Sequence, residues 1–320
     1  MTQPTNPYWA PVDPSAPNNS HAYALEMIGS NKRVLELGPA AGAFTRALVD
    51  NGCRVVAIEV DPDAAAGVEP VAERVIVGDL SDPAVVASAI DDERFDVVVG
   101  GDVLEHLRDP LEVLRGCRAA LKPGGYVVLS LPNIAHADVK LQLLDGRFPY
   151  RPTGLLDRTH LRFFTLESIH ELLHDAGLLP VDLRRVIVPV FATEQAVDPA
   201  TVPPEILERA TADAESETYQ FVVQALVHDG DAEVANLAKR AVILQTDLER
   251  ERAARAAAEQ DLDGLRTQVA ELRQRLAEVT SQATDFELLA QEHAAHIEAI
   301  QSTRSYRMLA PFRSLFARRG

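Results

Sequence analysis

Short unbroken apolar runs recur along the first 230 residues, and most of them end at glycine or acidic residues. A run of this kind, without alternating polar positions, is typical of a strand that is covered on both faces of a parallel sheet. Five runs predict successive strands: Val34–Leu37, Arg54–Ile58, Val75–Val77, Phe95–Val99 and Tyr126–Leu131. The chain therefore begins, after a short leading segment, with the pattern of a parallel α/β sheet.

Helical spacing and two later apolar runs complete this pattern. Apolar residues three and four positions apart predict helices. These helices are expected at His21–Ser30, Phe44–Leu48, Pro110–Leu121, Glu167–Ala176 and Pro203–Ala212. Val181–Val190 and Tyr219–Val227 predict two last strands that close an antiparallel edge. We predict one α/β domain over residues 23–229, a doubly wound, mostly parallel seven-stranded sheet.

From residue 232 the periodicity changes to a repeat of 3.5 residues. An apolar seam follows alternate steps of three and four residues from Val234 to Ile300, broken only at Glu251, Arg255 and His293. No proline interrupts this stretch, and a seam of this length is typical of a coiled coil. We predict a long helix over residues 232–300 that forms a parallel dimer or trimer, with the polar positions at 251 and 255 fixing the register.

The two ends of the chain have their own compositions. Residues 1–22 are rich in proline and predict a flexible N-terminal arm. Residues 301–320 contain five arginines, several aromatic and apolar residues, and no acidic residue. This basic amphipathic tail is suited to an anionic membrane surface, and equally to the acidic body of a neighbouring subunit.

Composition and charge limit the classes of partner and the cellular compartment that the sequence predicts. The net charge is −17, which disfavours nucleic acid as a partner. Only Cys53 and Cys117 are present, without metal-ligand spacing, which indicates a reducing compartment. The sequence shows neither a signal pattern nor an apolar run of spanning length. We expect a cytoplasmic protein, with peripheral contact at the inner face of the cell membrane if the tail binds lipid.

The turn after the first predicted strand carries the first candidate chemistry. Gly38 and Gly42 allow dihedral angles that are closed to other residues, and they let a ligand approach the backbone. Glu59 ends the second predicted strand, 21 positions after Gly38, a spacing that suits a ribose diol in a nucleotide-binding unit. A tighter Gly-x-Gly-x-x-Gly turn, typical of hydride-transferring dehydrogenases, is absent.

Over residues 23–228 the chain resembles class I S-adenosylmethionine-dependent methyltransferases. The family's acidic-x-Gly-x-Gly-x-Gly turn appears as Glu36-Leu-Gly38-Pro-Ala40-Ala-Gly42, with alanine at the middle glycine. The resemblance implies S-adenosylmethionine as cofactor, held by Glu36, Gly38, Gly42, Glu59, Asp79, Leu80 and Gly101. In that family, the glycines line the methionine part, Glu59 takes the ribose hydroxyls and Asp79 faces the adenine amine.

Transfer to a hydroxyl also needs a base or a Lewis acid, because hydroxyl pKa values are high. Asp102, Glu105 and His106 stand at i, i+3 and i+4, which would place them on one face of a turn or helix leaving the fourth predicted strand. His160 lies in the segment between the fifth and sixth predicted strands. We predict these four residues as the catalytic set. A plainer alternative is that Glu105 and His106 only cap the helix and order the loop.

The same four residues resemble the acidic-x-x-Glu-His motif, with a later histidine, of small-RNA 2′-O-methyltransferases and quinone-ring O-methyltransferases. That resemblance implies a divalent cation, Mg²⁺ or another, at Asp102, Glu105, His106 and His160. Asp102 replaces the first glutamate of the motif and is one methylene shorter.

Three functions stay open for the whole chain. The segment Gly154–Thr165 and the tail resemble bacterial methyltransferases of surface-glycan assembly, which implies O-methylation of a sugar in a glycan or glycolipid and a coiled coil that acts as a spacer. An alternative is a phenol or quinone O-methyltransferase whose pocket is lined by Phe148, Tyr150, Phe163 and Phe164. A third is a non-catalytic cofactor-binding scaffold for glycosyltransferases.

Overall fold

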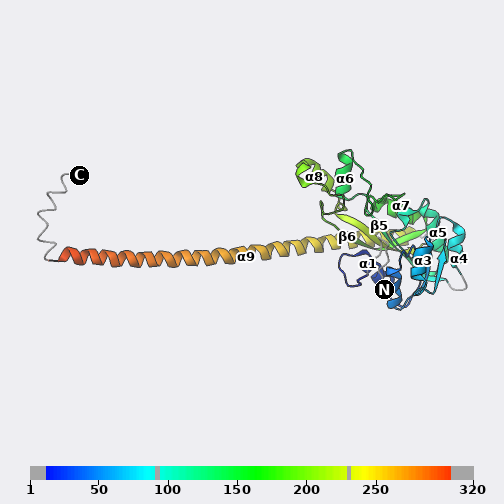
Figure 1. Ribbon diagram of the computed structural model, residues 1–320, viewed down its shortest axis with the longest axis horizontal. Helices are drawn as coiled ribbons and strands as arrows, with labels where there is room; N and C mark the ends of the chain where they lie inside the picture. The colour runs from blue at the N-terminus through cyan, green and yellow to red at the C-terminus, as the bar shows by residue number, and fades with distance from the viewer. Residues whose placement is uncertain (1–11, 91–93, 229–231, 304–320) are drawn as a thin grey trace. The chain divides into compact units, whose positions relative to one another are not determined.

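The computed structural model of the chain describes residues 12–90, 94–228 and 232–303 (Figure 1). The chain divides into a compact unit, Met1–Asp247, and a second unit, Leu248–Gly320. The first eleven residues of the predicted arm and the predicted basic tail from residue 304 onward lie outside the described residues. Both therefore stay predictions.

A seven-stranded sheet in the order β3-β2-β1-β4-β5-β7-β6 forms the centre of the first unit. The strands are β1 Arg33–Leu37, β2 Arg54–Glu59, β3 Arg74–Val77, β4 Phe95–Gly101, β5 Leu121–Pro132, β6 Leu178–Ile187 and β7 Thr218–Val227. β1 to β5 pair in parallel, whereas β7 is antiparallel to both β5 and β6. The predicted fold class is confirmed. The strand order reverses between β1 and β4, and ligands bind at the carboxyl ends of the strands beside such a switch point.

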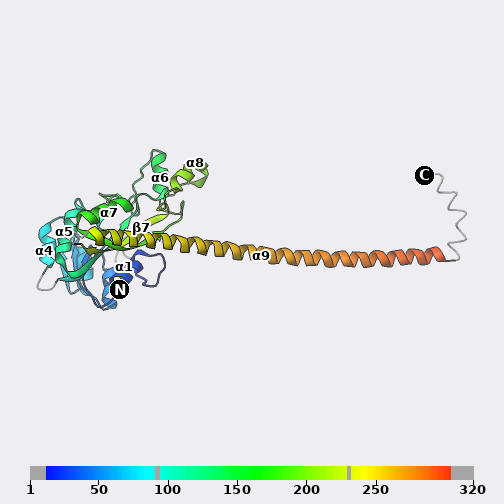
Figure 2. The same cartoon turned by 180° about the vertical axis from the view of Figure 1, so that it is seen from behind.

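Helices cover both faces of this sheet (Figure 2). α1 (Ser20–Ile28) and α2 (Ala43–Asp50) pack on one face, where they bury alternate side chains of β1 and β4. α4 (Pro83–Ala89), α5 (Pro110–Ala120) and α7 (Leu166–Asp175) pack on the other face and complete the larger apolar core. α3 (Pro62–Val68) contacts β2 and β3. The alternation explains why these strands are apolar along their whole length: each is covered on both sides.

The largest differences from the predicted boundaries lie in β5 and β6. Lys122–Gly125, which lies between the predicted helix Pro110–Leu121 and the predicted strand Tyr126–Leu131, is a bulge within β5, because Phe95 pairs with Leu121 and Val97 with Tyr126. β6 ends at Ile187, three residues before its predicted end at Val190, where the backbone leaves the ladder.

An additional layer is built from the segments that follow β5 and β6. α6 (Ala137–Leu144) lies side by side with α8 (Pro204–Thr211) in both views, and the two share a small apolar cluster (Figures 1 and 2). Short 3-10 turns, η1 at Leu104–His106 and η2 at Pro199–Thr201, complete the described elements of this unit. The loop from α6 to α7 returns to the sheet edge through a bridge between Asn133 and Phe164.

α9 is a continuous helix over Ala232–Ser302. The stretch 232–300, predicted as a coiled coil, is therefore helical, while the pairing with another chain stays a prediction. Within the described ranges, the structure contains no helix that is long and apolar enough to cross a membrane.

A nearly buried ion pair fixes the antiparallel edge and provides a first test. Arg185 Nε and Nη2 donate to the Glu215 carboxylate at 2.8 and 2.9 Å, and the two side chains are only 9% and 10% exposed. Replacing Arg185 by Met leaves a buried carboxylate without its counter-charge. We expect Arg185→Met to lower the free energy of unfolding by about 3 kcal/mol, measured by urea denaturation.

The matched control is Arg115→Met, which removes the exposed pair of Arg115 with Glu112. That change should cost less than about 1 kcal/mol, because exposed pairs contribute little. Equal losses in the two variants would show that the buried pair does not stabilise this edge.

Candidate functional site

The turn between β1 and α2 adopts left-handed backbone at three alternate positions. Gly38, Ala40 and Gly42 have φ of 60°, 47° and 76°. A side chain at Gly38 would also lie 2.9 Å from Val103, so glycine is required there for space as well as for conformation. The Ala40 N–H donates to the Glu59 carboxylate at 2.9 Å. The end of β2 thus holds the middle of the turn in place.

A cavity of about 790 Å³ opens at the carboxyl ends of β1, β2 and β4. Its lining includes most of the residues predicted from the sequence: Glu36, Gly38, Glu59, Asp79, Leu80, Gly101, Asp102, Glu105, His106 and His160. Gly42, also predicted to hold the cofactor, does not line it. Gly42 is instead the N-cap of α2 and packs against Arg46 and Val68. Gly42 thus has a structural role at the start of the helix, and its predicted contact with the cofactor stays a prediction.

Two buried carboxyl groups lie beneath the turn. Glu36 is 3% exposed, and this burial, opposed by a hydrogen bond from Thr45 and reinforced by the charge of Glu59, raises the pKa of Glu36 to about 7. Glu59 accepts backbone N–H groups on both oxygens, from Ala40 and from Asp61. A cationic ligand at the turn would therefore stabilise the ionised form of Glu36.

The second set of predicted residues is brought together by a backbone contact with the segment before α7. The main-chain carbonyl of Glu105 in η1 accepts hydrogen bonds from the N–H groups of Leu161 at 2.7 Å and Arg162 at 2.9 Å. His106 Nδ1 lies 3.3 Å from the carbonyl oxygen of Thr159. These contacts bring the His106 and His160 rings edge to face, with centroids 4.9 Å apart.

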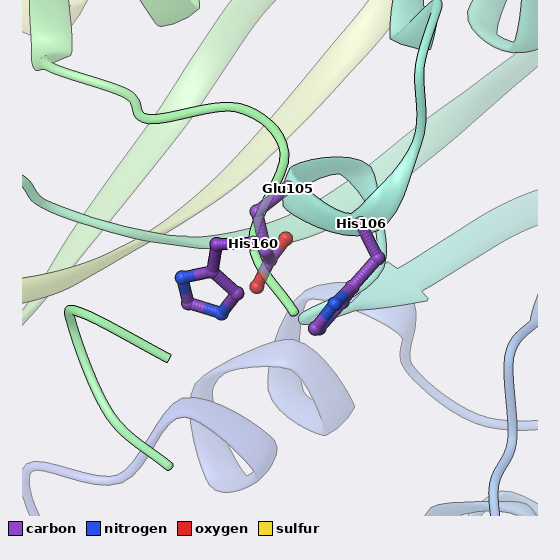
Figure 3. Close-up of side chains that lie close together, drawn as sticks. All are labelled: Glu105, His106 and His160. Atoms are coloured by element: carbon purple, nitrogen blue, oxygen red, sulfur yellow. The ribbon is translucent and has the colours of Figure 1, made fainter. Parts of the chain in front are cut away.

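Glu105, His106 and His160 form a compact group of possible ligand atoms. One ligand atom from each lies within 4.8 Å of the others. Figure 3 shows the three side chains directed toward one another, two from η1 and one from the facing loop. The geometry supports these three of the four residues predicted to hold a metal.

Asp102 lies outside that group, which corrects the prediction. The spacing i, i+3, i+4 assumed one helical face, but Asp102 has φ of 53° and η1 begins only at Leu104. Gln220 of β7 donates a hydrogen bond to the Asp102 carboxylate. The carboxylate is open to solvent within the cavity yet enclosed by protein on its other sides, and this partial desolvation raises the pKa of Asp102 to about 6.

Glu105 is the most deeply placed acid of the site. It is 1% exposed, and neither of its carboxyl oxygens has a hydrogen-bond donor among the N–H and hydroxyl groups of the described residues. Burial and the neighbouring charge of Asp102 raise the pKa of Glu105 well above its ordinary value. The neighbouring charges of Asp102 and Glu105 repel, which favours a proton or a cation at this pair.

The surroundings of His160 favour its neutral form. Burial, and the nearby ring of His106, lower the pKa of His160 below its ordinary value. Its Nδ1 is buried without a hydrogen-bond partner among the described residues. A neutral imidazole with a free nitrogen can accept a proton or bind a metal ion.

The loop that carries His160 is held by residues that the sequence did not single out. Glu194 accepts hydrogen bonds from the Leu155 N–H at 2.7 Å and from the Tyr219 hydroxyl at 3.1 Å. Gly154 has φ of 94°, and a Cβ there would lie 2.2 Å from the Glu194 carboxylate. Of these residues, only Gly154 belongs to a segment named from the sequence, Gly154–Thr165. The hydrogen-bond partners are separated by tens of residues, so no local pattern in the sequence connects them.

The predicted aromatic pocket is not part of the cavity. Phe148 contacts Tyr150 and Phe163 edge to face, but none of these three, nor Phe164, lines the cavity. Phe148 and Tyr150 are exposed, and Phe164 belongs to the core. The lining includes the polar residues Asp157, Thr159 and Gln220 together with Leu161 and Tyr219.

Comparison with known sequences decides the family. The profile of the family described as "Methyltransferase domain" matches residues 14–183, more than half of the chain. The chain belongs to this methyltransferase family. The predicted fold, with its glycine turn and cavity, agrees with that membership.

Curated relatives carry a more specific name. The chain is 30% identical over 158 residues to "Ubiquinone biosynthesis O-methyltransferase" of Cereibacter sphaeroides (strain ATCC 17029 / ATH 2.4.9). This alignment covers 48% of this chain and 63% of that protein. The protein of the same name from Ruegeria pomeroyi is 33% identical over 157 positions, covering 47% and 61%. The match thus spans less than two thirds of these relatives.

Solved structures with a similar fold include a SAM-dependent methyltransferase from Archaeoglobus fulgidus. It has a TM-score of 0.47 and 19% identity, and covers 64% of this chain and 92% of that one. A putative methyltransferase from Bacillus halodurans has a TM-score of 0.46 and 19% identity, covering 65% and 98%.

The strained position in the turn yields a prediction. Ala40 stands where the family pattern has glycine, and a left-handed alanine costs roughly 1 kcal/mol. We expect Ala40→Gly to raise the free energy of unfolding by about 0.5 kcal/mol, the relief of strain being partly offset by the freedom of glycine in the unfolded chain. Ala41→Gly is the control: its φ is not positive, so it should lower stability. Urea denaturation measures the free energy of unfolding of both variants. If Ala40→Gly is no more stable than Ala41→Gly, the turn is not strained at Ala40.

The raised pKa of Glu36 predicts a pH-dependent stability. The folded protein holds this proton up to about pH 7, whereas the unfolded chain releases it near the ordinary value of 4.5. The folded state then binds more protons between these values, so the contribution of Glu36 to the free energy of unfolding falls as pH rises through that window. Glu36→Gln should therefore be more stable than the natural chain at pH 8 and similar to it at pH 4.5.

Chemical denaturation of the ligand-free protein at the two pH values measures this difference. Glu171→Gln, at an exposed position of α7, is the control and should show no such pH dependence. A Glu36→Gln variant that is less stable at pH 8 would contradict the assignment.

Proposed function

We propose that this chain transfers a methyl group from S-adenosylmethionine to a hydroxyl oxygen of a small organic acceptor. The observation that carries the proposal is that one cavity contains both the glycine turn and the group of Glu105, His106 and His160. Membership of the methyltransferase family and the names of the curated relatives support the same chemistry.

The cofactor end of the cavity suits a cationic nucleoside. Glu36 lies buried below the turn and can balance a positive charge, while the exposed Asp79 is available to a base amine. Glu59 is close enough to the turn to accept ribose hydroxyls as well as the N–H groups it already binds. Leu80 and Gly101 line the same part of the cavity and offer apolar contact and space.

The acceptor end supplies the proton transfer. Methyl transfer breaks the bond between the methyl carbon and the cofactor sulfur, and forms one between that carbon and the acceptor oxygen. The hydroxyl proton must leave the oxygen, and in the site without a cation the imidazole of His160 or His106 accepts it. The leaving sulfide is neutral, so the positive charge lost by the cofactor is carried by the protonated imidazole at the end of the step.

A divalent cation is implied by the resemblance to quinone-ring enzymes, and the residues present fit one. Glu105 offers buried carboxyl oxygens without donors, and His160 a buried nitrogen without a partner among the described residues. With Asp102 outside the group, one carboxylate and two imidazoles favour Mn²⁺ or Fe²⁺ over Mg²⁺. Such a cation, when bound, lowers the pKa of an acceptor hydroxyl that it contacts.

A sugar hydroxyl is the second candidate acceptor. The polar residues Asp157, Thr159 and Gln220 of the lining favour an acceptor that is rich in hydroxyl groups, and the aromatic cluster lies outside the lining. The curated relatives favour a phenolic acceptor. Both classes present neighbouring oxygens, which is what the Glu105, His106 and His160 group would recognise.

A double substitution tests the chemistry. We expect His106→Asn with His160→Asn to lower methyl transfer by a factor on the order of 10² to 10⁴, because the proton acceptors are lost. Binding of S-adenosylhomocysteine, measured by calorimetry, should stay unchanged. His174→Asn, at an exposed histidine of α7, is the control and should retain full activity.

Isotope-labelled cofactor with catechols, nucleotide sugars and lipid-linked sugars in parallel identifies the acceptor. Transfer to catechols supports the proposal, and transfer to sugars alone supports the second candidate. Undiminished transfer by the double variant would overturn the assigned roles, while cofactor binding without transfer to any acceptor would favour a non-catalytic scaffold. Inhibition by a chelator, restored by Mn²⁺, would support the cation.

A further inference from the structure

The apolar seam of α9 is open to solvent along the single chain. Between Leu262 and Ile300 the large apolar side chains of this seam are 47% to 71% exposed. In heptad notation, the first seam position of each repeat is a and the second is d. The a positions are Leu262, Val269, Leu276, Ala283, Ala290 and Ile297, and the d positions are Leu265, Leu272, Val279, Phe286, His293 and Ile300. A stripe of this length needs a partner of matching length and period.

We infer that this seam pairs with the same seam of a second copy, parallel and in register, as a two-stranded coiled coil. The inference does not depend on the proposed function, because it rests only on residues of α9. Three observations carry it: the sizes of the seam residues, their polar exceptions and the charges beside the seam.

Side-chain sizes favour the in-register parallel arrangement. Phe286 is 71% exposed and is the largest side chain of the seam. In a parallel, in-register pair a d side chain enters a hole whose walls include the preceding and following a residues of the partner. Those residues are Ala283 and Ala290. Small residues on both sides of the phenylalanine layer give the two aromatic rings the room they need.

An antiparallel pair with full overlap lacks this match. It would place Phe286 opposite Leu248 and Ala283 opposite Glu251, which crowds one layer and buries an acid against a methyl group in another. In the parallel pair, Glu251 and Arg255 of each copy are one turn apart in neighbouring layers. The four charges then lie together and sum to zero.

The polar seam residues also favour two strands over three. Arg255 and His293 occupy seam positions, and both are exposed in the single chain. In a two-stranded coil the long arginine side chain can reach water past its neighbours, whereas a third helix would enclose it.

The flanking charges agree with a parallel pair. In that arrangement the residue directly before each a position faces a residue of the partner chain that lies five positions later in the sequence. That partner residue directly follows a d position. Asp261 then faces Arg266, and both are exposed. From residue 261 to residue 301 no two like charges face each other in this register. Opposite charges at these positions select the partner and its orientation.

Seam substitutions in the full chain test the pairing. The natural protein should have twice the 34.9 kDa mass of one chain by light scattering. Leu272→Lys with Leu276→Lys places charges in the seam and should give the mass of one chain. Gln274→Lys with Ala277→Lys adds the same charges in the same turn of the helix, outside the seam, and should keep the doubled mass.

Three results would overturn the inference: a single-chain mass for the natural protein, a threefold mass, or a doubled mass for the seam variant. The first would mean that another protein covers the seam. Each is measured without acceptor or cofactor, so a failure here is independent of the catalytic proposal.

A distance measurement tests the orientation. A spin label at Ser302→Cys reports on the end of α9, since Cys53 and Cys117 are buried and label poorly. The parallel pair should give a label separation of about 20 to 30 Å, given the helix diameter and the label arms, whereas an antiparallel pair would separate the labels by about 100 Å. The longer distance would refute the register.

Discussion

The main-chain carbonyl of Glu105 joins the two parts of the candidate acceptor site. It receives the N–H groups of Leu161 and Arg162, so the loop before α7 is held against the end of β4. These two hydrogen bonds, together with the contact of His106 with Thr159, set the position of His160 relative to His106. The backbone contact leaves the Glu105 side chain free to point into the cavity beside both imidazoles. One residue thus positions the loop through its backbone and contributes a functional group through its side chain.

The carboxyl groups of the cavity share one electrostatic feature. Glu36 and Glu105 are buried, Asp102 faces the cavity, and all three have raised pKa values in the ligand-free chain. Each therefore favours a proton or a cation over a bare charge. A cofactor with a positive charge at one end of the cavity, and a metal ion at the other, would stabilise the ionised carboxylates. The site is in this sense prepared for positively charged ligands.

Much of the fold could be predicted because it rests on local pattern. Apolar runs such as Val34–Leu37 are strands that are buried on both faces, and the helices between them followed from spacing. The turn residue Gly38 and the acid Glu59 also came to the cavity as expected, because both stand at the ends of parallel strands. The differences from the prediction fell where backbone conformation departs from regular structure: at Asp102, with its left-handed φ, and at Gly42, which begins a helix.

The sequence by itself determined the sheet, the long helix with its seam, and the identity of the residues that carry chemistry, because each of these depends on neighbours within a few positions. Only the tertiary structure decided which of those residues meet. His160 reaches His106 through hydrogen bonds between segments more than fifty residues apart. Gln220 joins the site from β7, and Glu194, in the loop after β6, holds the loop that carries His160. Such contacts leave no periodic trace in the chain, since they depend on how separate elements pack and not on their spacing.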